Sequence, residues 1–503
     1  MFMKFLFLAL FVAVMIGVGI YSRKKINNEQ DFLLGGRKMG PWISAFAYGT
    51  TYFSAVIFIG YAGKNGWNFG ISAVWIGIAN AVLGCLLSWL VLAKRTRKMT
   101  HDLNVSTMPD FFEKRYDSKG LKIVSSIIIF VFLVPYSASV YQGLSYLIEK
   151  TIAEPLGATF GITISFEAIM LIMAALTGIY LLLGGYVATA INDLIQGIIM
   201  ILGIILMVAF VVNHENVGGI AEGLSRLSQI PDVGEGLVKP FGPQPLSLLS
   251  LVILTSLGTW GLPQMIHKFY AVKDDDSIKK ATIVSTIFAT LISGGAYFIG
   301  VFGRLFVTLD EIGGDLDRIV PTMLEKALPD YLMGIVIILV LSASMSTLSS
   351  LVLVSSSAIS MDLVKGVFFP KMKSEKVMVL MRILCALFVA FSFVVGVRPS
   401  SILTLMSLSW GTVAGSFLAP FLYGLYWKGT TKAGAWTGMI VGFLCSVGGS
   451  MIFGLKNAPN VGAAAMLISL IVVPVVSLFT AKLPNAHINM IYGEEDSKQK
   501  LAS

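Results

Sequence analysis

The chain has 503 residues, of which 56% are hydrophobic and 13% are charged, and its formal net charge is +9. Its mean hydropathy of +0.81 excludes an ordinary soluble globular domain, in which about 25% of residues are charged. The basic residues gather in short runs such as residues 23–25 and 94–98, a pattern of cytoplasmic loops and not of a nucleic-acid-binding surface. We therefore expect one integral domain, residues 1–503, embedded in a lipid bilayer and without a nucleic-acid partner.

The first apolar stretch, residues 5–22, follows a single lysine and is itself followed by Arg23, Lys24 and Lys25. A signal peptide has its positive charge first and ends in a small-residue cleavage site. We therefore predict a retained N-terminal helix, with the N-terminus outside the cell membrane.

The second span begins near Pro41 and contains the sequence GTTYFS at residues 49–54. Glycine, threonine and serine at mid-membrane depth predict a broken helix whose free carbonyl groups can bind an ion. The alternative is a small-residue notch in a continuous helix that packs against a neighbour. A third span, residues 70–93, follows, and the sequence MPDFFEKRY at residues 108–116 predicts a short amphipathic helix in the next cytoplasmic loop.

Spans four, five and six are expected over residues 121–147, 161–183 and 187–213. Span six contains Asp193, an isolated carboxylic acid in an apolar segment. Such a residue costs about 2.5–3.5 kcal/mol on insertion scales, so it is by default a candidate functional residue. The polar segment after it, residues 213–244, is predicted to be an external loop.

Span seven, residues 245–269, contains the sequence GTWGLPQM at residues 258–265. Glycine and proline together predict a second broken helix. The last turn of this span carries His267 and Lys268, whose polar ends we expect to reach the cytoplasmic surface.

Span eight is expected over residues 281–303, and span nine contains the sequence LSASMSTLSS at residues 341–350. Helical spacing places one stripe of small and hydroxyl residues on a single face: Ala343, Ser346, Thr347 and Ser350. Such a stripe either lets helices approach closely or offers hard oxygen atoms to a small cation. Asp193 favours the second interpretation, with sodium held between this carboxylate and span nine.

The last four spans are expected over residues 377–397, 401–427, 434–454 and 461–481, before a cytoplasmic tail at residues 482–503. The two predicted broken helices begin two blocks of five spans, residues 41–213 and 245–427. Interrupted helices in corresponding positions indicate an inverted-repeat transporter. Because five is odd, the second block must have the opposite orientation in the membrane.

Five segments in this order resemble the sodium:solute symporter family, and most of all its proline and pantothenate branch: LLGGRKMGPW (33–42), STMPDFFEKRY (106–116), GGYVATAINDLIQ (184–196), SMSTLSS (344–350) and SWGTVAGSFLAPFLYGLYWKGTTKAGA (409–435). The resemblance covers residues from about 25 to 440. It implies an all-α, LeuT-type five-plus-five inverted-repeat bundle of about 13 transmembrane helices, which acts as a sodium-coupled symporter by alternating access and is not an enzyme.

The resemblance also implies roles for individual residues. The shared sodium site carries over to Thr50, Phe53, Ala343, Ser346 and Thr347. Some members hold a second sodium ion, for which Asp193, Ser349 and Ser350 are present. Arg37 matches a family arginine with a gating or coupling role.

The implied solute cavity is lined by residues of four spans: Thr51, Ser54, Tyr136, Gln142, Ser256, Thr259, Trp260, Ser409 and Trp410. Sugar carriers need several amide and charged side chains there, because an unpaired polar group in a dry site costs about 1–3 kcal/mol. Ile57, Ser256 and Thr259 stand at those places, so sugar is disfavoured. Thr255 and Thr259 also replace the aromatic residues of the proline carriers, which disfavours proline itself. We expect import of an amino acid or another small carboxylate by a monomer.

Three other functions remain alternatives: a sodium/sugar-type symporter, a sodium channel and a transporter-like sensor. A membrane-embedded enzyme is disfavoured, because the four histidines lie in or near predicted loops: His101, His214, His267 and His487. The three cysteines lie far apart in apolar spans and predict neither a disulfide nor a metal site: Cys85, Cys385 and Cys445.

Overall fold

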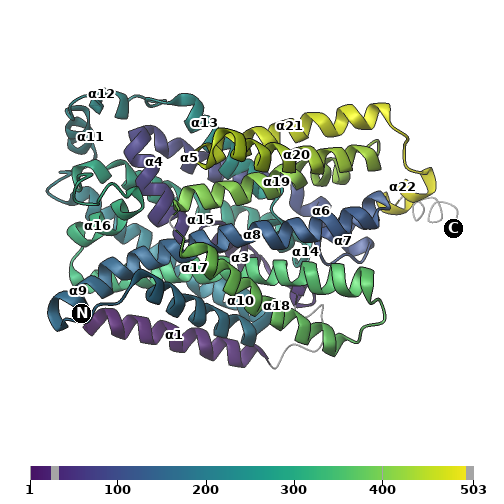
Figure 1. Cartoon of the computed structure of the whole chain (residues 1–503), viewed down its shortest axis with the longest axis horizontal. Helices are drawn as coiled ribbons and strands as arrows, with labels where there is room; N and C mark the ends of the chain where they lie inside the picture. Colours follow the sequence, from purple (N-terminus) through teal and green to yellow (C-terminus); the bar gives the residue numbers. More distant parts are fainter. Residues whose placement is uncertain (1, 24–32, 399, 494–503) are drawn as a thin grey trace.

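The computed structural model describes residues 2–23, 33–398 and 400–493, without the side chains of residues 2, 19–23 and 179–188. This described part is helical, and its one β-type pairing is an isolated parallel bridge between Met39 and Val272. Ten helices within it are long and apolar enough to cross a membrane, and two shorter apolar helices cover Met3–Val18 and Phe166–Gly178. The long helices run roughly along one axis of the bundle (Figure 1). The protein is therefore a multi-pass membrane protein, and the number thirteen stays a prediction.

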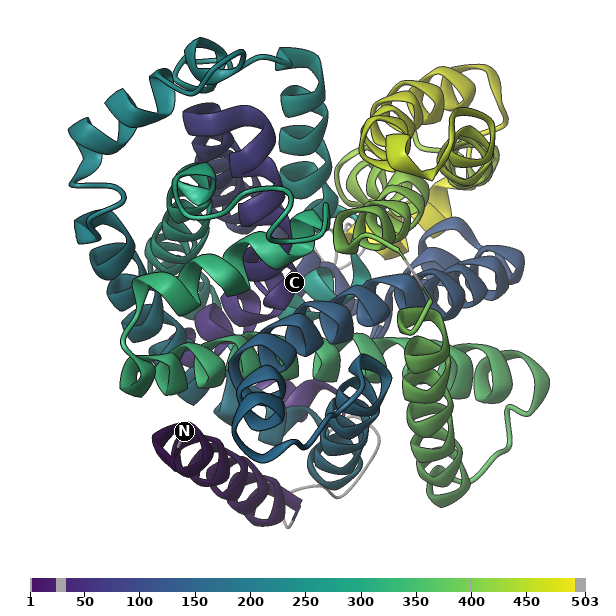
Figure 2. The same cartoon turned by 60° about the vertical axis from the view of Figure 1, so that its left-hand side comes forward.

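The N-terminal helix α1 (Phe2–Arg23) matches the expected first span. It contacts α10 (Phe166–Asn213) and α17 (Asp330–Ser357), on the side of the bundle away from the C-terminal helices α20 (Lys432–Phe453) and α21 (Ala458–Phe479) (Figures 1 and 2). The helix α1 is therefore a peripheral addition to the bundle.

The predicted break in the second span is confirmed. After the short η1 (Gly35–Arg37), helix α3 (Pro41–Tyr52) ends, and Phe53 has the extended backbone angles φ −109° and ψ 110°. Helical structure resumes with the π-helix η2 (Val56–Tyr61). Phe53 and Ser54 therefore interrupt the helix at the end of the GTTYFS sequence.

Helical segments then follow closely as far as the loop before α7: α4 (Ala62–Phe69), η3 (Gly70–Ala73), α5 (Val74–Ala79), η4 (Asn80–Leu87), η5 (Trp89–Ala93) and α6 (Lys94–Asp102). The basic residues expected to end the third span are instead part of α6, since lysine and arginine are good helix formers. The predicted loop helix is confirmed as α7 (Met108–Tyr116).

Helix α8 (Lys119–Ile148) matches span four and is followed by η6 (Glu149–Ala153) and α9 (Glu154–Phe160). Helix α10 extends from Phe166 to Asn213, across the boundary expected between spans five and six. That boundary falls among the residues whose side chains are outside the described part. The polar segment after it contains two short helices, α11 (Ile220–Ser228) and α12 (Gly234–Leu237).

The second predicted break is also confirmed. Helix α13 (Pro245–Leu257) passes into the 3-10 helix η7 (Gly258–Trp260), and α14 (Pro263–Tyr270) begins after Leu262, which has an extended backbone. Proline at the first position of α14 suits this new start, because its fixed φ fits a helix and it has no N–H to leave unpaired.

The remaining elements match the expected spans within a few residues, apart from short segments between and after the spans: α15 (Asp275–Val301), η8 (Gly303–Leu305), η9 (Leu316–Arg318), α16 (Ile319–Ala327), α17, η10 (Ala358–Phe368), α18 (Ser374–Gly396), α19 (Ile402–Tyr426), α20, η11 (Leu455–Asn457), α21 and α22 (Asn485–Tyr492). Helix α17 is the most enclosed, with every residue from Leu339 to Ser357 buried. It contacts α1, α3, α8, α10 and α18. Its hydroxyl-rich stripe therefore lies inside the bundle.

Candidate functional site

The break in α3 brings backbone oxygen atoms against the hydroxyl stripe of α17. The Thr347 hydroxyl donates to the carbonyl oxygens of Thr50 at 3.3 Å and Thr51 at 3.2 Å. The Ser346 hydroxyl donates to Thr50 Oγ1 at 2.8 Å. All four residues are at most 1% exposed, so these oxygens share one dry contact between two helices.

The five residues expected to form a sodium site lie on either side of this contact. Thr50, Ser346 and Thr347 touch directly. Phe53 lies one residue past the end of α3, where its extended backbone takes its carbonyl out of the helical hydrogen-bond pattern. Ala343 is fully buried one turn before Thr347. Neutral carbonyl and hydroxyl oxygens from a broken helix are groups that suit sodium.

Asp193 lies next to this contact, at the buried face of α10, and it has a partner that the sequence did not reveal. Its Oδ2 atom is 3.7 Å from Nζ of Lys268. Lys268 also donates to the Ser350 hydroxyl at 2.9 Å, and that hydroxyl is 3.0 Å from Thr51 Oγ1. One chain of polar contacts therefore links α10, α14, α17 and the end of α3.

The expectation that Lys268 and His267 reach the cytoplasmic surface is wrong, because Lys268 is 2% and His267 5% exposed. The helix α14 starts only after the break and packs against α3 and α17, so its basic residues point into the bundle. A buried ammonium group needs a nearby opposite charge, and Asp193 supplies it.

The residues expected for a second sodium ion are only partly assembled. Asp193 and Ser350 both contact Lys268, whereas the Ser349 hydroxyl donates to the Ser346 carbonyl of its own helix at 2.8 Å. Neither carboxylate oxygen of Asp193 makes a hydrogen bond of ordinary geometry within the described residues, although the hydroxyls of Ser346 and Thr50 lie beside it. The pairing of Asp193 is therefore mainly electrostatic.

A cavity lies on the other side of the break, between α3, η2, η4, α8, α13, α15 and α19. The space in it that water-sized molecules can occupy is about 20 Å³, room for about one water and far below the roughly 300–1,000 Å³ of typical ligand sites. It is lined by aromatic, apolar and uncharged polar residues: Tyr52, Phe53, Ser54, Val56, Ile57, Tyr61, Asn80, Tyr136, Thr255, Tyr297, Met406 and Trp410. The lining suits one small organic molecule, and the cavity must widen to admit it.

Three of the nine residues expected to line a solute site line this cavity, namely Ser54, Tyr136 and Trp410. The Thr51 hydroxyl instead contacts Ser350. Gln142 donates to the Gly396 carbonyl at 2.9 Å. The other four are placed in neighbouring walls: Ser256 bonded to Asn80, Thr259 to Gly84, Trp260 to Leu83, and Ser409 buried on α19.

Asn80 was missed by the sequence reasoning. It lines the cavity, and its Oδ1 atom accepts from Thr255 at 2.8 Å and Ser256 at 3.1 Å. Its Nδ2 atom donates to Ser293 at 3.3 Å. The signal was present in the sequence, because a lone amide in an apolar span calls for the same attention as Asp193.

Tyr136 lies between the two sites. Its side chain is 1% exposed and belongs to the cavity wall, and its hydroxyl lies beside Ser54, Thr347 and Trp410. A change in the position of Thr347 therefore reaches the cavity through one side chain.

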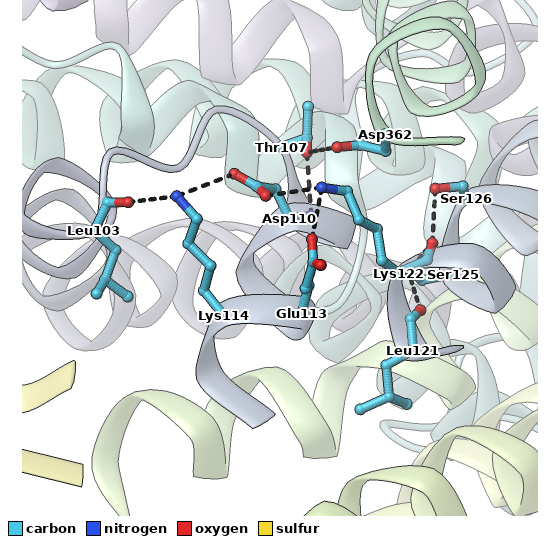
Figure 3. Close-up of polar contacts among 10 residues, drawn as sticks. All are labelled: Leu103, Thr107, Asp110, Glu113, Lys114, Leu121, Lys122, Ser125, Ser126 and Asp362. Atoms are coloured by element: carbon cyan, nitrogen blue, oxygen red, sulfur yellow. Dashed lines mark hydrogen bonds and ion pairs between the residues drawn. The ribbon is translucent and has the colours of Figure 1, made fainter. Parts of the chain in front are cut away.

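A further polar cluster, also missed, lies where α7 meets the end of the long helix that contains α17 and η10 (Figure 3). Lys122 Nζ is 3.0 Å from Asp110 Oδ1 and 2.7 Å from Glu113 Oε2. Thr107 donates to Asp362 Oδ1 at 2.7 Å. Because Asp362 belongs to η10, which continues α17, this cluster fixes the loop helix to the helix with the hydroxyl stripe.

Arg37 lies on η1, before α3, with a left-handed backbone at φ 56°. Its Nη2 atom donates to the Val105 carbonyl at 2.6 Å. Burial lowers the pKa of its guanidinium group from the ordinary value. Arg37 therefore ties the start of α3 to the segment between α6 and α7.

Comparison with known proteins gives consistent matches along the chain. A profile described as "Sodium:solute symporter family" matches residues 32–442. The sodium/proline symporter of Escherichia coli (strain K12) is 30% identical over 445 residues, covering 86% of this chain and 84% of the relative. That of Staphylococcus aureus (strain JH9) is 29% identical over 454 residues, covering 88% and 84%.

Solved structures match over almost the whole chain. A Na⁺-coupled sialic acid symporter in a substrate-bound, outward-open state has a TM-score of 0.75 at 18% identity, covering 96% of this chain and 98% of its own. Mhp1, a nucleobase-cation-symport-1 family transporter, has a TM-score of 0.55 at 14% identity, covering 92% and 99%. These likenesses concern the fold.

Proposed function

Since the chain belongs to the sodium:solute symporter family, we propose that it imports a small amino acid or related carboxylate through the cavity at the α3 break. The protein has the LeuT-type fold, and sodium is its coupling ion. It is a transporter and not an enzyme. The solute, the residues that bind it and the residues that bind sodium are the proposed part.

The contact of Thr347 with the carbonyls of Thr50 and Thr51 is the observation that carries the proposal. In the proposed site, sodium is held by the carbonyls of Thr50, Phe53 and Ala343 and the hydroxyls of Ser346 and Thr347. The ion replaces the hydrogen bonds that these hydroxyls now donate. It joins the broken helix to α17, and its release to the cytoplasm lets the two separate.

Tyr136 couples the ion to the solute in this mechanism, because its hydroxyl lies beside Thr347 on one side and Ser54 and Trp410 on the other. One sodium ion provides enough driving force. A charge that crosses about 100 mV gives about 2.3 kcal/mol, and a tenfold sodium gradient adds about 1.4 kcal/mol. The sum supports roughly 500-fold accumulation of a neutral solute.

The cavity lining favours a small amino acid. None of its described lining residues is charged, so an ionised carboxylate must be met by other groups. The bound sodium is available for this, whereas the N–H groups of Val56 and Ile57 at the start of η2 already donate to Ser54. The aromatic residues Tyr52, Tyr297 and Trp410 suit an apolar side chain or ring. Proline is the natural first probe, since two relatives are named sodium/proline symporters.

The basic runs in the sequence support an orientation with the N-terminus outside and the C-terminus in the cytoplasm. The two breaks, at the starts of residues 41–213 and 245–427, support the division into inverted repeats, with residues 5–22 and 434–481 as additions. The sites lie within one chain, which supports function as a monomer in the cell membrane.

The proposal is tested by uptake of labelled L-proline, and then of other small amino acids, into proteoliposomes with and without an inward sodium gradient. Thr347→Ala is compared with Ser356→Ala, a buried hydroxyl of α17 that bonds to its own helix at Val352. We expect sodium-dependent uptake in the parent and in Ser356→Ala, and uptake that needs about tenfold more sodium in Thr347→Ala. Uptake that ignores sodium, or equal loss in both variants, contradicts the proposed site.

A further inference from the structure

The ammonium group of Lys268 lies where a second sodium ion was expected. Its Nζ atom lies 3.7 Å from Asp193 and 2.9 Å from Ser350. These are two of the residues that the sequence suggested for that ion. The lysine and the aspartate are 2% and 1% exposed, so the ammonium group and a sodium ion have the same few oxygen atoms to share.

Charge balance separates the two cations. Asp193 and Lys268 together are neutral, so a sodium ion entering between them meets an equal positive charge at contact distance. Like charges in a poorly solvated site repel strongly, and an ion that leaves water there needs full compensation. The carboxylate of Asp193 can balance one positive charge. The ammonium group of Lys268 already provides that charge.

The ammonium group of Lys268 does not exclude sodium from the neighbouring proposed site at Thr347. Ser350 contacts Thr51 at 3.0 Å, and the Thr51 carbonyl accepts from Thr347. The ammonium group is thus linked to the first ion's site through two hydroxyl-bearing residues, and it does not occupy that site. One mobile cation at Thr347 and one tethered cation at Lys268 satisfy both sets of oxygens.

We infer that Lys268 is a specificity-determining residue whose ammonium group takes the place of a second sodium ion, so that this symporter binds one sodium ion. The inference deepens the proposed function and rests on it. It assigns Asp193 and Ser350 as ligands of the lysine, and it predicts that removal of the amine exposes a second sodium site.

The test is binding of ²²Na⁺ to the purified full-length protein, measured as ions per protein and as the shape of the saturation curve. No transported solute is needed. We expect one ion and a hyperbolic curve for the parent and for Lys268→Arg, which keeps the charge. We expect two ions for Lys268→Ala and Lys268→Met, and one ion again when Asp193→Asn is added to either.

A purely structural ion pair does not change the number of ions bound, so the count separates the two roles. Monodisperse elution and an unfolding temperature for each variant show that it is folded. Two ions in the parent, or one ion in folded Lys268→Ala and Lys268→Met, overturn the inference and leave the first site intact. If neither variant folds, the number of sodium ions bound by the parent protein decides: one ion supports the inference and two overturn it. Absence of saturable sodium binding in the parent overturns the proposed function as well.

Discussion

The buried pair of Asp193 and Lys268 makes a sharp prediction about stability. The charges are 3.7 Å apart and at most 2% exposed. At an effective dielectric constant of about 20, their attraction is about 4.5 kcal/mol. Asp193→Asn leaves the ammonium group without its counter-charge, and removal of one member of a buried pair costs about 3–5 kcal/mol. We expect a loss of that size.

The double variant Asp193→Asn, Lys268→Met is the control, because it removes both charges and leaves none unpaired. We expect it to recover most of the stability lost in Asp193→Asn. The assay is thermal unfolding of purified protein in detergent. For a chain of 503 residues, about 4 kcal/mol corresponds to a shift of roughly 4 °C. A single variant as stable as the parent, or a double variant less stable than both single variants, refutes the reasoning.

Three further predictions concern other parts of the molecule. Thr347→Ala removes one hydroxyl ligand, and a loss of about 1.4 kcal/mol raises the sodium concentration for half-maximal uptake about tenfold, whereas Ser356→Ala leaves that concentration unchanged. Burial raises the pKa of Asp317, in the short segment η9, to about 6, above its unfolded value of about 3.8. The folded state therefore binds this proton more tightly, so the contribution of Asp317 to stability is fully present below about pH 4 and is lost as the pH rises through about 6. The difference in unfolding temperature between these two pH values therefore changes in Asp317→Asn, which lacks this contribution. Lys122→Met leaves Asp110 and Glu113 without their shared cation (Figure 3), and we expect a loss of about 2 kcal/mol in thermal unfolding, because these carboxylates are partly exposed. An unchanged half-maximal concentration, the same pH dependence in Asp317→Asn, or an unchanged unfolding temperature in Lys122→Met contradicts the corresponding prediction.

The sequence was sufficient for features that depend on local chemistry. Glycine, threonine and proline in apolar spans predicted the breaks at Phe53 and Leu262, and hydrophobic run length placed α8 and α17 within a few residues. Helical spacing also placed Ser346 and Thr347 on one face, where the structure brings both against Thr50. These inferences need no knowledge of how the helices dock.

The positions of Lys268 and Gln142 depend on docking and could not be obtained in this way. Lys268 is near the end of its span, where a snorkelling side chain is the usual arrangement, but the restart of α14 after the break turns it toward Asp193. Gln142 is a polar residue in an apolar helix, yet it bonds the Gly396 carbonyl far from the cavity wall. Helix rotation decides which of two equally polar residues lines a site.

Asn80 marks the boundary between these cases. As a polar residue in an apolar span it deserved the same attention as Asp193, and the structure places it on the cavity wall. Its partners Thr255 and Ser256 lie 175 and 176 residues away in the chain. The residue itself was recognisable from the sequence, whereas its contacts were not.

The most direct test of the central claim measures ²²Na⁺ and labelled solute together as they enter the same proteoliposomes. We predict that each requires the other, that they enter in a fixed ratio of one to one, and that both fluxes need about tenfold more sodium in Thr347→Ala but not in Ser356→Ala. Sodium entry without solute, or solute entry at an unchanged rate without sodium, contradicts the claim that the ion at the α3 break drives import.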